Sequence, residues 1–219
     1  MSPTPTLLIV AKAPVAGFAK TRIGAEQGHD RAAEVAAAAL LDTLETATTA
    51  GWPVVVALTG ELGDAARSTE IARALEATRV VAQRGNTFGE RLAHAHLDAD
   101  AGHGVVQVGM DTPQVTVDDY LAAGRALQDG ASVLGPATDG GWWLLGLRDG
   151  RDAHVLTDVP MSRLDTGELT VQALANLHPH HDVPLLRPLT DLDTWADVLA
   201  VAAELPGSHL ARALAQVAA

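Results

Sequence analysis

Positive charge gathers in one short segment of an otherwise acidic chain. The sequence holds only two lysines, Lys12 and Lys20, and Arg22 follows in the same stretch, AKAPVAGFAKTR. Ammonium and guanidinium groups are common phosphate ligands, and a glycine-containing loop can also present backbone N–H groups to an anion. We therefore expect a phosphate to bind here; the alternative is a surface loop whose charges are neighbours by chance.

This segment matches neither of the common glycine-rich nucleotide motifs. A Walker A loop needs glycine immediately before the lysine and again five residues earlier, where this chain has Ala19 and Pro14. The dinucleotide-binding pattern G-x-G-x-x-G is also missing from the segment. The sequence thus gives no support to a P-loop enzyme or to a Rossmann dehydrogenase.

Carboxylates lie in two further motifs. Asp111 stands in GMDTP directly after the apolar run VVQV, while Asp191 and Asp193 stand in DLDTWAD. Mg²⁺ and Mn²⁺ prefer one or two carboxylates together with substrate phosphates, so the three aspartates could share such a cation. The alternatives are a turn before proline for Asp111 and a helix N-cap at Asp193 or Thr194.

A glycine-rich stretch, GPATDGGWW, offers a place for a second substrate. Gly140 and Gly141 allow close backbone approach or a positive φ, and Asp139 could bind an acceptor or act as a general base. Adjacent residues of a strand face opposite sides, so at most one of Trp142 and Trp143 should face a pocket. A hairpin turn with core tryptophans is the alternative.

The histidines point to no such site. His94 and His96 are two residues apart on an expected helix and should face different sides, which disfavours a shared metal. The HPHH segment at 178–181 is expected to be a solvated loop. No G-x-S-x-G elbow or Ser-His-Asp arrangement is recognisable.

Alternating apolar runs and helical patterns must position these motifs. They predict an α/β fold with a mostly parallel sheet and helices on both faces. Expected strands cover 6–11, 53–58, 80–81, 104–108, 131–134, 142–147 and, at an edge, 183–189; expected helices cover 29–50, 64–77, 87–98, 116–128, 165–177 and a stretch from 195. Ligands of such sheets bind outside the carboxyl ends of the strands, which is where three of the motifs fall.

Composition narrows the function classes. The net charge of −12 argues against a nucleic-acid or anionic-membrane partner, and the lack of cysteine excludes disulfides and thiolate metal sites. No apolar stretch approaches the roughly 20 residues of a membrane span, and the N-terminus lacks the pattern of a signal peptide. We expect a cytoplasmic protein with one domain over residues 1–219; its oligomeric state stays open.

Taken in order, the segments 12–22, 109–113, 135–146 and 191–194 resemble the glycosyltransferase-like family of the nucleotide-diphospho-sugar transferase superfamily. Some of its members are associated with arsenosugar biosynthesis. The resemblance implies a GT-A fold, a single Rossmann-like three-layer α/β sandwich that binds a nucleotide with a divalent metal, Mg²⁺ or Mn²⁺.

The resemblance also implies roles for individual residues. It places the nucleotide and its phosphates on Lys12, Ala13, Pro14, Gly17, Lys20, Thr21 and Arg22. It places the metal on Asp111, Asp191 and Asp193, and the acceptor on Asp139, Gly140, Gly141 and Trp142. Catalysis would rest on Asp139 and Lys20.

Three functions follow from these expectations. The first is a glycosyltransferase that moves a sugar from a nucleotide-diphospho-sugar to a small-molecule acceptor. The second is a guanylyltransferase-like nucleotidyltransferase that uses a nucleoside triphosphate and releases pyrophosphate. The third is a nucleotide-binding module without turnover. Gly109 stands where typical GT-A glycosyltransferases have the first aspartate of Asp-x-Asp, and the N-terminal loop lacks the Gly-Gly-x-Ser/Thr-x-Arg pattern of sugar nucleotidyltransferases.

Overall fold

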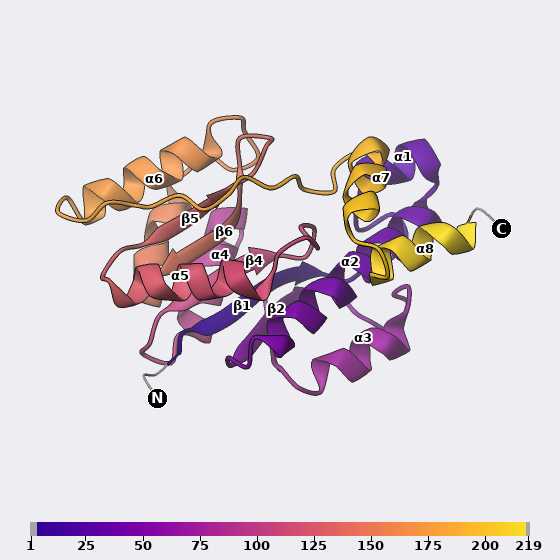
Figure 1. The fold of residues 1–219 in the computed structure, drawn as a ribbon, viewed down its shortest axis with the longest axis horizontal. Helices are drawn as coiled ribbons and strands as arrows, with labels where there is room; N and C mark the ends of the chain where they lie inside the picture. Colours follow the sequence, from indigo (N-terminus) through magenta and orange to yellow (C-terminus); the bar gives the residue numbers. More distant parts are fainter. Residues whose placement is uncertain (1–3, 218–219) are drawn as a thin grey trace.

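A six-stranded sheet runs through the middle of the computed structural model, which describes residues 4–217 (Figure 1). The strand order is β3-β2-β1-β4-β6-β5. Its strands are β1 (Thr6–Lys12), β2 (Val54–Thr59), β3 (Arg79–Ala82), β4 (Val105–Gly109), β5 (Val133–Pro136) and β6 (Trp142–Leu147). Only β6 runs against its neighbours, so the sheet is mixed and mostly parallel, as the sequence predicts.

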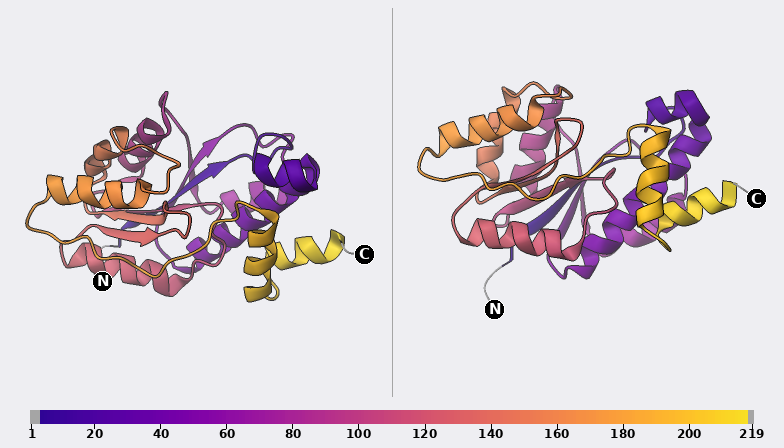
Figure 2. Two further views of the ribbon diagram at one scale, coloured as in Figure 1. Left: turned by 90° about the horizontal axis from the view of Figure 1, so that it is seen from above. Right: turned by 45° about the horizontal axis from the view of Figure 1, so that its top comes forward.

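Helices cover both faces of this sheet, as the views from two sides show (Figures 1 and 2). They are α1 (Thr21–Gln27), α2 (His29–Thr49), α3 (Ser68–Leu75), α4 (Phe88–Ala99), α5 (Val117–Gln128), the 3-10 helix η1 (Gly150–Thr157), α6 (Thr166–Leu177), α7 (Trp195–Glu204) and α8 (His209–Val217). Capping boxes begin α4, α5 and α7 at Thr87, Thr116 and Thr194. Each box satisfies two backbone N–H groups of a first helical turn, which fixes where these helices start.

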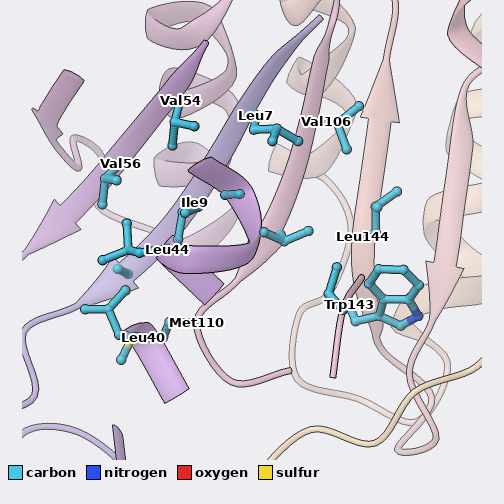
Figure 3. Packing of buried hydrophobic residues seen from close by; sticks show 14 of the residues in the cluster. Leu7, Ile9, Leu40, Leu44, Val54, Val56, Val106, Met110, Trp143 and Leu144 are labelled. Carbon is cyan, nitrogen blue, oxygen red and sulfur yellow. The ribbon is translucent and has the colours of Figure 1, made fainter. Parts of the chain in front are cut away.

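Alternation along β1 separates two hydrophobic cores. Leu7 and Ile9 join the cluster formed with α2, α3 and α5, where Figure 3 shows Ile9 beside Leu44. Leu8 points to the other face and packs with residues of α4. Successive side chains of a strand face opposite sides, so a sheet buried on both faces requires an almost continuous apolar run.

A third cluster lies at one end of the molecule, where α7 and α8 pack beside α1 and the first half of α2 (Figures 1 and 2). Ile23 of α1, Val35 of α2, Val198 of α7 and Leu210 of α8 are buried together there. The segment that enters α7 contributes Leu192, which is fully buried. This packing holds the start of α1 next to residues 191–193.

The edge strand expected at 183–189 is wrong as a strand. The segment forms only two isolated bridges to the β5 edge, Leu134 with Leu185 and Ala137 with Leu189. Pro184 and Pro188 lack the N–H groups that a continuous ladder needs. The segment nevertheless runs along this edge and then crosses to α7 (Figure 1).

Other differences concern helices. The loop expected over 11–22 ends at α1, which starts at Thr21, and η1 was not expected; α8 is the last helix, which was expected without bounds. Helix α3 starts at Ser68, four residues later than the expected position 64. Within residues 4–217, no helix is long and apolar enough to cross a membrane. The N-terminal prediction that no signal peptide is present falls partly on residues 1–3, outside the described residues.

Candidate functional site

The carboxyl ends of β1 and β4 and the start of β6 form one rim of the sheet. The register pairs Val10 with Gly109 in the parallel β1–β4 ladder. Residues just beyond these strands therefore lie side by side, and Lys12, Asp111 and Asp139 all line one cavity of about 1200 Å³. Motifs that lie far apart in the sequence thus share one site, in the position where open α/β sheets bind ligands.

Lys20 forms the central contact of this cavity. It has left-handed backbone angles, φ 49° and ψ 48°, as the N-cap of α1. Its ammonium lies 2.8 Å from Asp111 Oδ2 and 3.7 Å from Asp193 Oδ1, and only 11% of its side chain is exposed. Arg22 follows one residue into α1 and places Nη1 2.8 Å from Asp193 Oδ2. Two cations of the segment 11–22, Lys20 and Arg22, are therefore in direct contact with two of the expected metal ligands.

Asp191 brings a buried carboxyl oxygen to this site, one that is unpaired within residues 4–217. Its Oδ1 is buried and accepts no hydrogen bond from the described residues. Burial, followed by the like charge of Asp111, raises the pKa of Asp191 to about 8, and the charges of Asp139 and Asp193 add to the increase. A buried carboxylate oxygen without a donor is costly unless a cation or a proton lies beside it.

The pKa of Asp111 shifts in the opposite direction to that of Asp191. Burial raises its pKa, but the charge of Lys20 and the hydrogen bond from its ammonium outweigh burial, so the pKa of Asp111 is lowered. Gly109 leaves room for this carboxylate, since a Cβ at Gly109 would lie 2.6 Å from Asp111 Oδ1. An aspartate at position 109 would therefore require the Asp111 carboxylate to move.

Asp111, Asp191 and Asp193 are candidate ligands of a hard divalent cation, although among the described residues their carboxylate oxygens do not all lie within 4.8 Å of one another. Asp111, Asp191 and Asp193 come from two segments held together by the backbone hydrogen bond from Leu192 N to Asp111 O, of 2.9 Å. One of their oxygens is buried without a donor, and their mutual repulsion calls for a positive charge. Carboxylate oxygens are the ligands that Mg²⁺ and Mn²⁺ prefer.

The glycine-rich turn between β5 and β6 forms the adjoining wall. Asp139 Oδ1 accepts a hydrogen bond of 2.8 Å from Gly141 N, which closes an Asx turn. Gly140 has a φ of +90°, and a Cβ there would lie 2.0 Å from Leu164 O. Both uses of Gly140 expected from the sequence, a positive φ and close approach, are therefore realised.

The two adjacent tryptophans separate as strand geometry requires. Trp142 lines the cavity and is half-buried, whereas Trp143 is buried in the core and donates from Nε1 to Arg187 O at 3.0 Å. Asp139 and Gly141 also line the cavity. The acceptor side expected from the sequence thus has one aromatic wall available to a ligand.

Residues of the first loop divide into two groups. Lys12, Lys20, Thr21 and Arg22 line the cavity. The remaining members, Ala13, Pro14 and Gly17, are not among its lining residues; Ala13 and Pro14 are buried and Gly17 takes a φ of +78°. Only the first group is therefore placed to contact a ligand in this cavity.

Sequence reasoning missed the wall opposite the carboxylates. Phe88 and Arg91 of α4 line the cavity there, together with Met161 and Leu164. One signal could have drawn attention to this wall: the chain has only two phenylalanines, Phe18 and Phe88, and both line this cavity with about two fifths of their surface exposed.

A second acidic cluster lies away from the cavity and has a structural role. Ligand atoms of Asp42, Glu45 and His209 lie within 4.8 Å of one another. Both oxygens of Asp42, however, already accept backbone hydrogen bonds at the start of α8, from His209 N at 2.7 Å and Leu210 N at 2.9 Å. Asp42 therefore caps α8 and anchors it to α2.

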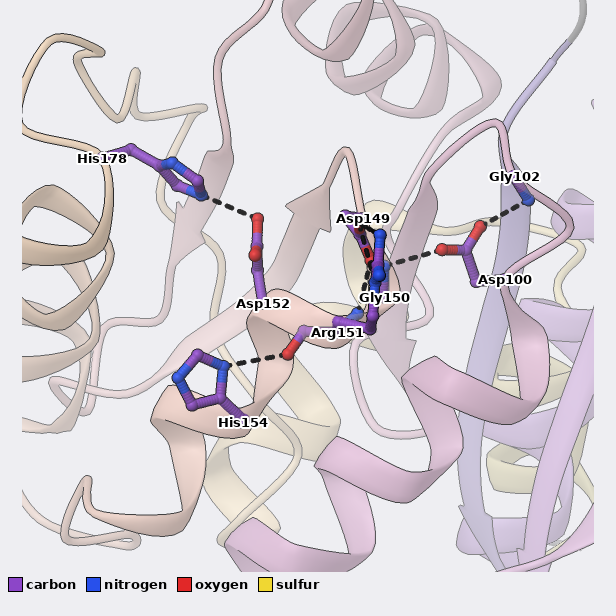
Figure 4. Close-up of polar contacts among 8 residues, drawn as sticks. All are labelled: Asp100, Gly102, Asp149, Gly150, Arg151, Asp152, His154 and His178. Atoms are coloured by element: carbon purple, nitrogen blue, oxygen red, sulfur yellow. Dashed lines mark hydrogen bonds and ion pairs between the residues drawn. The ribbon is translucent and has the colours of Figure 1, made fainter.

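The opposite rim of the sheet carries a polar network of its own (Figure 4). Asp100 accepts from Gly102 N and Gly150 N, both at 2.7 Å, and Asp152 Oδ2 lies 2.8 Å from His178 Nε2. The HPHH segment was expected to be a solvated loop, but His178 is tied to η1. These contacts join α4, η1 and the end of α6 far from the cavity.

The family is shown by comparison with known sequences. A family model described as "uncharacterized protein conserved in bacteria (DUF2064)" matches residues 41–163. A search of curated proteins finds no significant match. The family match covers more than half of the chain.

Solved structures share the whole fold. A candidate nucleotide-diphospho-sugar transferase from Desulfovibrio desulfuricans G20 is similar with a TM-score of 0.83 and 26% identity, over 98% of this chain and 95% of that one. Rv0371c from Mycobacterium tuberculosis H37Rv, solved in complex with manganese, gives 0.53 and 19%, over 90% and 98%. The 4-diphosphocytidyl-2C-methyl-D-erythritol synthase of Anaerococcus prevotii gives 0.62 and 12%, over 93% and 96%. The chain belongs to the DUF2064 family and shares its fold with transferases.

Proposed function

We propose that this member of the DUF2064 family is a metal-dependent transferase whose donor is a nucleotide-diphospho-sugar. The observation that carries the proposal is the pairing of Lys20 with the Asp111, Asp191 and Asp193 cluster at the rim of the sheet. A site with both carboxylates and cations suits a ligand that arrives as a metal–diphosphate complex, because the ligand then supplies both opposite charges.

Asp111, Asp191 and Asp193 would hold Mg²⁺ or Mn²⁺ in this proposal. When bound, the cation neutralises charge that develops on the departing nucleoside diphosphate. The Asp191 oxygen that lacks a donor is the group best placed to gain from such a cation. The manganese in the complex of the Mycobacterium tuberculosis neighbour supports this choice of ligand through the shared fold.

Lys20 would exchange partners when the donor binds. Its ammonium now contacts Asp111 at 2.8 Å, so it stands beside the oxygen that the cation needs. Once a cation neutralises that carboxylate, the ammonium can bind a phosphate oxygen instead. Lys12 and Arg22 line the same cavity and would add charge-assisted contacts to the diphosphate.

Asp139 would orient the acceptor. Its Oδ1 is held by Gly141 N, which fixes the carboxylate and leaves Oδ2 for a hydroxyl of the acceptor. In glycosyl transfer that hydroxyl oxygen forms the new bond to the anomeric carbon, the bond from that carbon to the diphosphate breaks, and the hydroxyl proton passes to the carboxylate.

Nucleotidyl transfer is the second candidate, favoured by the synthase among the structural neighbours. The same residues would then bind a nucleoside triphosphate, the acceptor oxygen would attack the α-phosphorus, and pyrophosphate would leave. Gly109 also favours it, because it stands where typical GT-A glycosyltransferases have the first aspartate of Asp-x-Asp. A nucleotide-binding module without turnover is the remaining alternative.

One experiment separates these functions. The protein is incubated with Mn²⁺ and a panel of nucleotide sugars, nucleoside triphosphates and small acceptors, and released nucleoside diphosphate and pyrophosphate are assayed separately. Nucleoside diphosphate supports sugar transfer, pyrophosphate supports nucleotidyl transfer, and binding without either product supports the module. Asp111→Asn should abolish release, whereas Asp149→Asn, which removes a carboxylate at the opposite rim, should not.

A further inference from the structure

The wall opposite the carboxylates is built by close packing of α4 on η1. A Cβ at Gly89 would lie 2.1 Å from Leu156 O, so only glycine lets the start of α4 approach η1 this closely. The start of α6 is in turn held to the β5–β6 turn, where Gly167 N donates to Gly140 O at 2.8 Å. Phe88, Arg91 and Leu164 all line the same cavity, so these contacts hold the parts of the chain that carry them.

Arg91 is the distinctive charge of this wall. Among residues 4–217 the other arginines that line the cavity have carboxylate partners: Arg22 pairs with Asp193 and Arg163 with Asp165. Arg91 makes no ion pair with a described residue; its guanidinium lies 5.6 Å from the centre of the Phe88 ring. A half-buried guanidinium on an aromatic face is oriented by that face and keeps its donors available for an anion.

Apolar side chains line the same cavity as this guanidinium. Phe88 is 42% exposed and Leu164 is 87% exposed, although both are large hydrophobic residues. Trp142 and Met161 are half-buried in the same cavity. Apolar surface combined with a few fixed polar groups is the usual composition of a small-molecule site.

We propose that this wall is a subsite for an acceptor that carries one anionic group, a carboxylate or a phosphate, on an apolar body. Arg91 binds the anionic group, and Phe88, Trp142 and Leu164 cover the apolar body. The description of the ligand as an acceptor rests on the proposed function; the binding of such a compound does not. The acceptor hydroxyl then lies toward Asp139, on the wall shared with Trp142.

The test uses defined probes without added metal or nucleotide. Phenyl phosphate and benzoate carry an anion on an apolar ring, benzyl alcohol carries the ring alone, and inorganic phosphate carries the anion alone. Binding is followed by calorimetry and by tryptophan fluorescence, with Trp142→Phe identifying the reporter. Arg91→Met should weaken phenyl phosphate or benzoate about ten- to a hundredfold, the loss expected for one charge-assisted contact. It should leave benzyl alcohol nearly unchanged.

Matched variants locate the effect. Lys12, like Arg91, lines the cavity without an ion pair to a described residue, and Lys12→Met removes its charge. Arg151→Met removes an exposed arginine at the opposite rim of the sheet. Each variant should change the affinity for phenyl phosphate by less than about threefold. Phe88→Ala should weaken both ring-bearing anions but leave inorganic phosphate unchanged. Comparison of the two anionic probes shows whether carboxylate or phosphate is preferred.

The outcomes that overturn the subsite are distinct from those that overturn the transferase. No binding of either ring-bearing anion by the wild type, equal effects of Arg91→Met and Arg151→Met, or a larger effect of Lys12→Met would each reject it. Turnover of a nucleotide donor together with such results leaves the transferase standing. Arg91-dependent probe binding without either released product rejects the transferase and leaves the subsite standing.

Discussion

From the sequence, Lys20 is expected to bind a phosphate of the nucleotide and Asp111 to bind the metal ion. In the structure they bind each other, at 2.8 Å. Sequence reasoning could place both at strand ends, because apolar runs and turn residues mark those ends. It could not find their contact, since this depends on the left-handed backbone of Lys20 and on the burial of α1 against α7.

The Lys20–Asp111 contact leads to a prediction with opposite signs for two ligands. Lys20→Met should strengthen binding of Mn²⁺ alone, because the metal no longer competes with an ammonium for Asp111 and Asp193. The same change should weaken a nucleoside diphosphate in the presence of Mn²⁺ by about ten- to a hundredfold, the loss of one charge-assisted contact. Calorimetry of each ligand measures both effects.

Arg151→Met is the control for this pair of titrations, since it removes one positive charge at an 81% exposed position on the opposite rim. It should leave both affinities within about a factor of three, as expected for an exposed ion pair. Weaker binding of Mn²⁺ alone in Lys20→Met would contradict the exchange of partners proposed for Lys20.

At the scale of elements, a helix start can be predicted from the sequence where a nearby side chain accepts hydrogen bonds from the free backbone N–H groups of the first turn. The helix expected over 116–128 agrees with α5, whose start is fixed by a capping box with both partners, Thr116 and Asp119, within four residues. The start of the last helix, α8, could not be placed from the sequence because its cap, Asp42, lies more than 160 residues earlier in α2. The segment 183–189 was misassigned because its apolar residues line β5 without forming a full ladder.

The junction of Gly140 with Leu164 should be a sensitive point for stability. Gly140→Ala introduces a Cβ 2.0 Å from Leu164 O and also a side chain at φ +90°. Gly102→Ala is the matched control, since Gly102 has a φ of +86° but no atom within 4 Å of the added Cβ. Both variants bear the cost of a left-handed alanine, roughly 1–2 kcal/mol, and only Gly140→Ala adds a clash.

Urea denaturation of the two glycine variants measures this difference. We expect Gly140→Ala to lower the free energy of unfolding by about 1–3 kcal/mol more than Gly102→Ala does. It should also weaken phenyl phosphate binding, because the loop that carries Leu164 must shift. Equal losses of stability would show that the loop moves away at no cost.

At the scale of the whole molecule, two clusters of packed helices position the two halves of the cavity. The cluster of α1, α2, α7 and α8 holds Lys20 and the 191–193 segment, while the cluster around α4, η1 and α6 holds the wall with Arg91. The sheet between them places Asp111 at its rim. The α/β class and the strand ends followed from the sequence, whereas this division required the packing of the helices.

The second of these halves depends on a buried polar contact between α4 and the sheet. His96 is fully buried, and its Nε2 lies 2.9 Å from Gln107 Oε1 of β4. Burial lowers the pKa of His96 from its ordinary value of 6.5 to about 4, although the hydrogen bond with Gln107 and the charge of Asp100 act in the opposite direction. The folded protein therefore favours the neutral imidazole.

Because the unfolded chain binds this proton at a higher pH than the folded protein does, His96 should reduce stability as the pH falls from about 6.5 toward 4. The pKa difference corresponds to a loss of stability on the order of 3 kcal/mol, which is complete below the pKa of the folded protein.

His96→Gln keeps an amide N–H donor for Gln107 but does not titrate. The free energy of unfolding of each protein is measured by urea denaturation at pH 7 and at pH 4. Between these two pH values it should fall less in His96→Gln than in the wild type, by up to about 3 kcal/mol. His103→Gln, in an exposed loop, serves as the control and should follow the wild type. Carboxylates titrate in all three proteins, so the difference isolates His96, and parallel curves for wild type and His96→Gln would mean that the imidazole is protonated in the folded core.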